Sequence, residues 1–151
     1  MDDASYVTGL VDGEGSFLIS FQQRPKMRTG IEVRPSFTLS QHQRNIEALE
    51  FLQNFFDCGS IRFNRSDETY KYEVRSIDDL ARVIIPHFEE YPLRTSKRND
   101  FLVFKNICAV IQQGNHLFQS GLMNIVHQAY EMNNFGARRY DKQHLLKILT
   151  R

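Results

Sequence analysis

The sequence of 151 residues contains no tryptophan and only two cysteines, Cys58 and Cys108. Two cysteines can supply neither a framework of several disulfides nor the four-ligand set of a structural zinc site. Both cysteines lie in apolar segments, which predicts free, buried thiols and a reducing intracellular compartment. This prediction does not distinguish a bacterial cytoplasm from a mitochondrion or a chloroplast.

Long apolar segments are also missing. No run of apolar residues approaches the roughly 18 that a membrane span requires, and the first residues, MDDASYV, lack both the basic and the apolar part of a signal peptide. Hydrophobic residues make up 41% of the chain and charged residues 25%, which is typical of globular proteins and argues against disorder. We therefore expect a single domain over residues 1–151 that does not associate with membranes.

The chain has no strong charge of either sign, since its formal net charge is +1. Its charges are nevertheless segregated: residues 1–15 contain four acids and no base, whereas residues 16–45 contain five bases and one acid. Segregation can create a basic face on a nearly neutral protein, as nucleic-acid binding requires. The charge pattern also fits an ordinary mixed surface, and by itself it does not choose between the two.

Hydrophobic periodicity predicts an N-terminal helix, two units that each consist of a β-hairpin and a helix, and a helical tail. All four expected strands have one apolar face, on which we place Phe63 among others, so we predict an α+β fold with helices covering one side of an antiparallel sheet. Pro35 indicates an edge or a bulge in the second strand. The expected strands are 16–24, 31–40, 61–64 and 70–75, and the expected helices are 4–12, 44–56, a segment opened by Ser76, 97–113, 119–132 and 141–150.

The polar face of the predicted sheet carries the side-chain types that read DNA. Arginine pairs with guanine, asparagine and glutamine pair with adenine, and a two-stranded ribbon fits the major groove. Aromatic residues are nearly absent from this face, which favours duplex DNA over single strands. An ordinary solvated sheet face is the alternative interpretation. The expected DNA contacts are Ser16, Leu18, Ser20, Gln22, Arg24, Glu32, Arg34, Ser36, Thr38, Ser40, Arg62, Asn64, Lys71, Glu73 and Arg75.

Two glycines, Gly9 and Gly13, lie four residues apart in the first predicted helix. Each glycine costs a helix interior about 1 kcal/mol relative to alanine. Two of them on one stripe therefore predict that another backbone comes close to that face of the helix.

The nonamer that contains these glycines, Val7–Gly15 (VTGLVDGEG), resembles the motif of the LAGLIDADG homing endonuclease family. Residues 92–105 (PLRTSKRNDFLVFK) resemble the second signature of that family, in which a basic PL-x-T-K-K segment precedes Asp-Phe. The paired lysines of that signature are here Ser96 and Lys97. The resemblance implies the αββαββα fold with a saddle-shaped sheet, a core over about residues 4–113 and a helical extension over about 114–151.

The resemblance also implies a site. Glu14 is expected to hold the metal with the help of the Gly13 backbone carbonyl, while Asp12 caps or supports the helix. The metal is expected to be Mg²⁺, with Mn²⁺ able to substitute and Ca²⁺ able to bind without supporting cleavage. Gln41 would hold the attacking water, and Lys97 would lie near the scissile phosphate. Arg94, Arg44 and Asn45 are further candidates for supporting groups. No small-molecule cofactor is expected.

A chain with one such motif is expected to act as a homodimer on a near-palindromic duplex of roughly 20 base pairs. The interface would consist of Tyr6, Gly9, Leu10 and Gly13, since the two glycines let two helices pack backbone to backbone. The implied activity is site-specific, double-strand DNA cleavage by a protein encoded in an intron or similar mobile element. The alternative is a DNA-binding regulator or an intron RNA maturase of the same fold that does not cleave.

Overall fold

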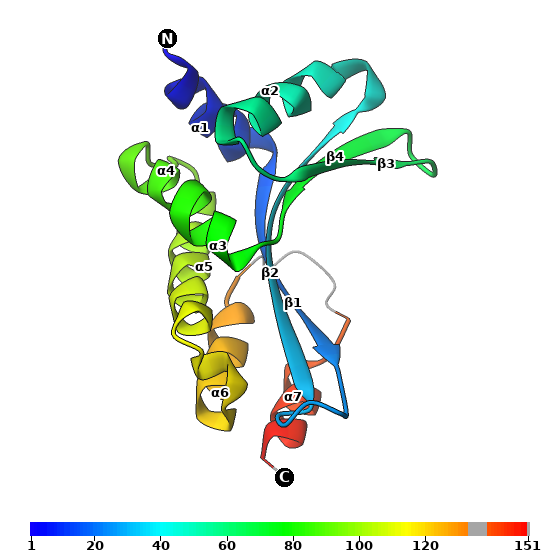
Figure 1. Cartoon of the computed structure of the whole chain (residues 1–151), viewed down its shortest axis with the longest axis vertical. Coiled ribbons are helices and arrows are strands. Elements are labelled where there is room, and N and C mark those ends of the chain that lie inside the picture. The colour runs from blue at the N-terminus through cyan, green and yellow to red at the C-terminus, as the bar shows by residue number, and fades with distance from the viewer. Residues whose placement is uncertain (133–138, 151) are drawn as a thin grey trace. The chain divides into compact units, whose positions relative to one another are not determined.

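The computed structural model describes residues 1–132 and 139–150, and its elements follow the predicted order (Figure 1). The strands are β1 (Gly15–Gln23), β2 (Ile31–His42), β3 (Ser60–Asn64) and β4 (Thr69–Val74). The helices are α1 (Asp3–Glu14), α2 (Ile46–Phe56), α3 (Ile77–Asp79), α4 (Ile85–Glu90), α5 (Lys97–Gln112), α6 (Gln119–Ala129) and α7 (Lys142–Leu149). Short 3-10 turns form η1 (Gln43–Asn45) and η3 (Asn115–Leu117), and a π-helical turn forms η2 (Leu80–Ile84) between α3 and α4.

The four strands form one antiparallel sheet in the order β1-β2-β4-β3. Strand β2 pairs with β4 from Phe37 opposite Val74 to His42 opposite Thr69. Pro35 indicated an edge or a bulge, but β2 is an inner strand of the sheet. Pro35 precedes the stretch paired with β4, so its missing N–H removes no bond to β4. The α+β class and the αββαββα order predicted from the sequence are therefore confirmed.

The chain divides into two compact units, one of residues 1–17 and 36–98 and the other of residues 18–35 and 99–151. Strands β1 and β2 and helix α5 pass from one unit to the other. We describe each unit separately.

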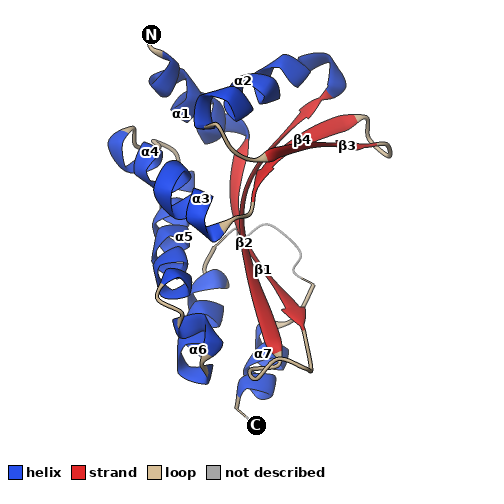
Figure 2. Ribbon diagram, in the orientation of Figure 1, coloured by secondary structure: helices blue, strands red, loops and turns tan. Residues whose placement is uncertain are grey.

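The core of the first unit is built on aromatic side chains. Phe17 and Phe37 on the strands pack against Phe88 of α4, with ring centroids 5.5 and 5.7 Å apart, and Phe37 also contacts Phe56 of α2 at 6.1 Å. Phe63 was expected inside this core, and that expectation is wrong because its side chain is 44% exposed. Phe63 lies on β3, the edge strand of the sheet (Figure 2), and its ring packs on Tyr70 of β4 with centroids 4.8 Å apart.

The second unit buries the apolar side of the helical tail. Ile19 and Phe21 of β1 and Ile31 of β2 are buried, and Phe21 stacks on Tyr130 at the end of α6 with centroids 6.3 Å apart. The buried residues of α5, α6 and α7 are Phe101, Phe104, Ile107, Cys108, Ile111, Leu122, Ile125, Val126, Ala129, Leu145 and Leu149. In the described part of the chain, no helix has both the length and the apolar character needed to cross a bilayer.

Both cysteines are free thiols, as predicted, but Cys58 is half-buried rather than buried. Cys108 is buried in the second unit, and burial raises the pKa of its thiol to about 12. Burial also raises the pKa of Cys58, helped by the negative charges of Asp79 and Asp57. Neither thiol is therefore a reactive thiolate near neutral pH.

Candidate functional site

The candidate site lies at the end of α1, where the first signature meets β1. The helix begins at a capped end, because the Asp2 carboxylate accepts a 2.7 Å hydrogen bond from the Ser5 N–H. It ends where the Gly15 N–H donates to the Val11 carbonyl and the chain turns extended. The last carbonyls of a helix have no partners within the helix and form the negative end of its dipole. This end of α1 therefore favours cations.

Lys97, which begins α5 in the second signature, supplies one such cation. Its Nζ donates to the carbonyls of Val11 at 2.8 Å and Asp12 at 3.1 Å. The family resemblance implied that Lys97 lies near the scissile phosphate. The structure places its ammonium group on the end of α1, where it stabilises the last turn of the helix.

Asp12 joins the two signatures directly. Its carboxylate accepts hydrogen bonds from the Arg94 N–H at 2.7 Å, the Thr95 N–H at 3.1 Å and the Thr95 hydroxyl at 2.6 Å. Partial burial by itself would raise the pKa of Asp12, but the bonds from Thr95 and Arg94 and the charge of Lys97 outweigh it, so the pKa lies below its ordinary value. Asp12 thus supports the helix end, as the sequence suggested.

Glu14 is exposed at the last position of α1. Its carboxylate has no hydrogen bond or ion pair with any other described residue, in contrast to that of Asp12. Among the residues that the structure describes, no three acidic, cysteine or histidine side chains gather as a metal site. An unpartnered carboxylate at the negative end of a helix nevertheless provides hard oxygen ligands of the kind that Mg²⁺ prefers. Gly13 and Glu14 therefore fit one half of a site for a divalent cation.

One face of α1 is open in the single chain. A Cβ atom added at Gly9 or at Gly13 would meet no atom within 4 Å. Tyr6 on the same helix is 44% exposed and packs edge-on against Phe51 of α2, while Leu10 is half-buried. The expected interface residues therefore lie on a surface that another backbone can reach.

The other expected catalytic groups lie around the end of β2. Gln41 is half-buried, and its side-chain oxygen accepts a 3.4 Å hydrogen bond from the side-chain amide of Asn45. Arg44 is exposed, and its backbone N–H donates to Nδ1 of His42 at 3.2 Å. The structure thus brings Gln41 and Asn45 together, two residues that the sequence placed in the site for separate reasons.

The expected DNA contacts lie in both units and are exposed or half-buried with one exception. In the first unit they are Ser16, Ser36, Ser40, Arg62, Asn64, Lys71, Glu73 and Arg75, and in the second Leu18, Ser20, Gln22, Arg24, Glu32 and Arg34. The exception is Thr38, which was expected to be accessible but is only 6% exposed. Thr38 lies directly opposite Glu73 in a strand with neighbours on both sides, which cover its short side chain.

Each unit also has one acid on this face between two arginines. In the second unit, Glu32 accepts a hydrogen bond from Nε of Arg34 and lies 3.9 Å from Nε of Arg24. In the first unit, Glu73 lies 3.7 Å from Arg62 and 4.0 Å from Arg75. The sequence placed both glutamates among the expected DNA contacts, and in the structure both carboxylates lie against arginines.

Sequence reasoning missed a buried group that supports α1 from within the first unit. The Thr8 hydroxyl donates to the Tyr91 carbonyl at 2.9 Å and lies 3.0 Å from Nε2 of His87. Because the hydroxyl proton is used on Tyr91, Nε2 of His87 must be the donor in the second bond. Burial lowers the pKa of His87 to about 4, so the ring is neutral near pH 7. The one signal in the sequence is that Thr8 lies beside Val7 and near Val11 on the buried side of α1, where a hydroxyl requires a hydrogen-bond partner.

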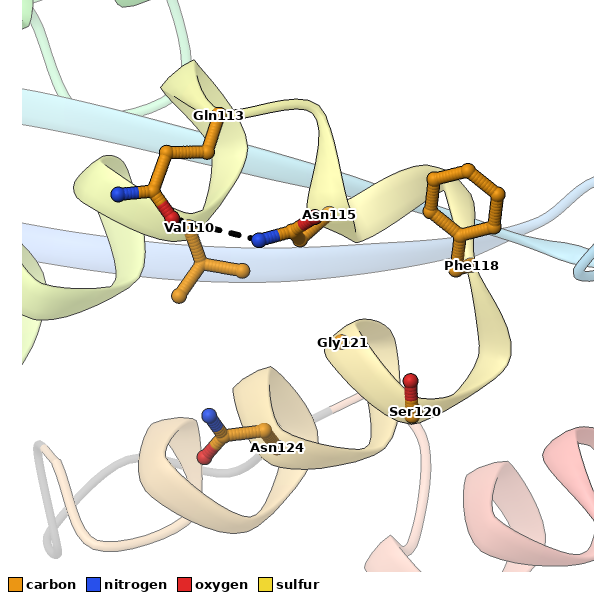
Figure 3. Close-up of a pocket in the computed structure, with 7 residues that line it drawn as sticks. All are labelled: Val110, Gln113, Asn115, Phe118, Ser120, Gly121 and Asn124. Carbon is orange, nitrogen blue, oxygen red and sulfur yellow. Dashed lines mark hydrogen bonds between the residues drawn. The ribbon is translucent and has the colours of Figure 1, made fainter.

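The second unit contains a pocket of about 520 Å³ where α5, η3 and α6 meet (Figure 3). Two of its lining side chains bond each other, since the Asn115 amide donates to Gln113 at 3.3 Å. Its lining is Val110, Gln113, Asn115, Phe118, Ser120, Gly121 and Asn124. None of these side chains titrates near neutral pH, so the pocket offers no side-chain acid or base for catalysis.

Comparisons with known proteins match both signatures and the whole fold. The sequence profile of the LAGLIDADG endonuclease family matches residues 7–108. The crystal structure of the homing endonuclease I-TnaI is 36% identical, with a TM-score of 0.85 over 99% of this chain and 98% of that one. The archaeal intron-encoded homing endonuclease I-Vdi141I, solved in complex with DNA, is 30% identical, with a TM-score of 0.89 over 97% of this chain and 94% of that one.

A sequence relative comes from Neurospora crassa, where probable intron-encoded endonuclease 3 is 37% identical over 127 residues. The match covers 83% of this chain but only 24% of the relative. The chain thus spans a small part of that longer protein.

Proposed function

This chain belongs to the LAGLIDADG endonuclease family, and we propose that it is a site-specific DNA endonuclease of the homing type. The observation that carries the proposal is the carboxylate of Glu14, which is exposed and unpartnered at the end of a helix that two sets of long-range contacts hold in place. The intron-encoded relatives support an origin in an intron or a similar mobile element. The reducing intracellular compartment remains a prediction.

The proposed chemistry is hydrolysis of phosphodiester bonds with a divalent cation. Glu14 and the carbonyl of Gly13 would hold the cation, with Mg²⁺ as the expected ion, Mn²⁺ as a substitute and Ca²⁺ as an ion that permits binding only. Such a cation lowers the pKa of a bound water and stabilises the leaving oxygen. Asp12 and Lys97 act as positioning residues, because their contacts fix the backbone that presents Glu14.

Gln41 is the proposed group that orients the attacking water, and Asn45 holds the Gln41 amide by the 3.4 Å hydrogen bond described above. Since the Lys97 ammonium group binds the end of α1, we assign contact with the scissile phosphate to Arg94 of the same signature. Arg94 is exposed, and its backbone N–H is fixed on Asp12. Its side chain therefore starts from a defined position close to the end of α1.

We further propose that the active form is a homodimer. In one chain, Gly9 and Gly13 cost stability and meet no neighbour, whereas a second copy of α1 packed on the same stripe would use the close approach that they allow. That packing would also bring a second Glu14 to the first, which supplies the carboxylate that a single chain lacks. The target would then be a near-palindromic duplex contacted by the polar sheet residues of both copies.

The test is cleavage of a library of duplexes in Mg²⁺ by the wild type and by Glu14→Gln, with DNA binding measured in Ca²⁺. We expect the wild type to cut at a defined site as a dimer. The variant should lose cleavage by at least about 10³-fold while still binding the site, since the amide removes the ligand charge and little else. Glu47→Gln, which changes an exposed acid on α2, serves as the matched control and should cut normally.

Selective binding without cleavage by either protein would overturn the nuclease proposal and favour a regulator or an RNA maturase. Sedimentation of the wild type with and without the target tests the dimer separately. A monomer that still cuts both strands would overturn the assignment of Gly9 and Gly13 to an interface between copies.

A further inference from the structure

The C-terminal segment of the second unit contacts two successive glutamines of β1. Arg139 Nη1 lies 2.7 Å from the side-chain oxygen of Gln22, and His144 Nε2 lies 3.1 Å from the side-chain oxygen of Gln23. Gln22 alternates with the buried Phe21 and so belongs to the polar face proposed to read DNA. Arg139 thus touches a proposed base-reading side chain, although no sequence pattern gave this segment a function.

Tyr140 fixes the position of Arg139. The Arg139 guanidinium lies 5.4 Å from the centre of the Tyr140 ring, and the ring stacks on His144 at 5.9 Å with an interplanar angle of 15°. The Tyr140 carbonyl accepts a hydrogen bond from the Tyr130 hydroxyl, and its own hydroxyl accepts one from the Gln23 N–H at 3.4 Å. The bond between Arg139 and Gln22 is therefore anchored at several points, unlike a contact between two free surface side chains.

The contact also fixes which way the Gln22 amide points. A guanidinium group has only donors, so it can bond only the oxygen of the amide. An unrestrained glutamine offers one donor and one acceptor, which together match N6 and N7 of adenine. The bond from Arg139 uses one of the two lone pairs of the Gln22 oxygen, and the remaining N–H groups of Arg139 lie beside the amide, so the pair together presents more donors than acceptors.

We infer that Arg139 and Gln22 form a single donor-rich element that selects guanine at the base pair contacted by Gln22. Guanine presents two acceptors, N7 and O6, in the major groove, whereas adenine presents one acceptor and one donor. Arg139 thus converts a glutamine that would prefer adenine into one that prefers guanine. This inference rests on the proposed DNA-binding function and names a specificity-determining residue for it.

The experiment is selection of bound duplexes from a randomised library in Ca²⁺ with the wild type, Gln22→Ala, Arg139→Ala and Arg139→Lys. Gln22→Ala identifies the position that this element reads, as the position where selectivity drops. At that position we expect the wild type to prefer guanine over adenine by roughly tenfold, the scale of a good base contact. Arg139→Ala should cut this preference to below about threefold or reverse it, because it frees the amide oxygen for adenine N6.

Two further variants separate readout from folding and from charge. Arg139→Lys keeps a donor for the amide oxygen and should restore part of the guanine preference. Arg82→Ala removes an exposed arginine of the first unit that pairs with Asp78, so it should leave the preference at every position unchanged. Thermal melting of each variant shows whether the fold is retained.

The outcomes distinguish this inference from the proposed function. If the wild type selects a site and Arg139→Ala keeps the guanine preference at the position defined by Gln22→Ala, the inference is wrong and the DNA-binding function stands. A preference for adenine in the wild type at that position also overturns it. If the wild type selects no site, the proposed function fails and the inference fails with it.

Discussion

The two units hold their functional side chains in different ways. In the first unit, the end of α1 is fixed by three hydrogen bonds to Asp12 and two from Lys97, and Thr8 binds His87 and Tyr91 from the buried side. In the second unit, Gln22 is held by one exposed hydrogen bond from a residue 117 positions away. The proposed catalytic end is thus held directly by several bonds, whereas Gln22 is held by one bond and depends on the contacts that fix Arg139.

The largest change in folding stability is expected from the protonation of His87 in the first unit. Burial lowers its pKa from 6.5 to about 4, so the folded state binds the proton more weakly than the unfolded state does. The stability that His87 contributes is therefore full above pH 6.5 and is lost as the pH falls towards 4, by up to about 3 kcal/mol. Urea unfolding between pH 7 and pH 4 measures this loss. His87→Gln, which keeps a donor for Thr8 but does not titrate, should show a flatter pH dependence, and an unchanged profile would contradict the assignment.

The next largest effect is expected from Asp12→Asn, which tests the rigidity of the proposed catalytic end. The amide replaces one acceptor by donors that face the N–H groups of Arg94 and Thr95, which should cost about 2 kcal/mol of folding free energy and slow cleavage at least tenfold. Denaturant unfolding and single-turnover cleavage measure the two quantities. Asp78→Asn, which breaks only an exposed 2.9 Å pair with Arg82, should stay within about 0.5 kcal/mol of the wild type. Equal losses of folding free energy in the two variants would show that the contacts of Asp12 contribute no more than an exposed ion pair.

A smaller effect is expected at the acids that lie between arginines in each unit. Glu32→Gln and Glu73→Gln should each raise the affinity for an unrelated duplex by about threefold. Without the carboxylate, the positive charge of the neighbouring arginines is no longer offset and attracts DNA phosphates more strongly. Fluorescence anisotropy at several salt concentrations measures the change and the slope. An affinity that falls in either variant would mean that its glutamate contacts DNA directly.

The smallest effect should come from Tyr140→Phe in the second unit. The substitution removes the hydroxyl that accepts from the Gln23 N–H at 3.4 Å but keeps the ring against Arg139 and His144. We expect less than about 0.5 kcal/mol of lost stability, since the bond is long and partly solvated. Thermal melting measures it, and a loss as large as that of Asp12→Asn would remove the proposed contrast between the two units.

Most of the fold could be predicted because each element carries its own local signal. Alternation on residues 16–24 placed β1, and Ser76 with Asp79 three residues later marked a helix start that the structure confirms with a 3.3 Å hydrogen bond. Local signals failed where the surroundings decide burial. Phe63 alternates like a buried strand residue but lies on an edge strand, and Thr38 alternates like a surface residue but is enclosed between two strands.

The site could be predicted only in part for the same reason. Glu14 and the two glycines were found because the nonamer is a contiguous pattern, and Lys97 was found because it belongs to a second one. Its contact with the end of α1 was not predicted, because a sequence pattern does not state which carbonyls a long side chain reaches. Thr8 and His87 lie 79 positions apart, and no local feature of either residue points to the other.

The sequence by itself determined the family, the order of the elements and the position of the exposed acid at the end of α1, because short contiguous patterns encode helix ends, strand faces and signatures. Only the tertiary structure decided that Lys97 supports a helix rather than standing free, that Glu32 and Glu73 are engaged by arginines, and that Arg139 orients Gln22. These decisions depend on contacts between residues far apart in the chain. Which atoms bond each other is determined only when the folded backbone brings these residues together.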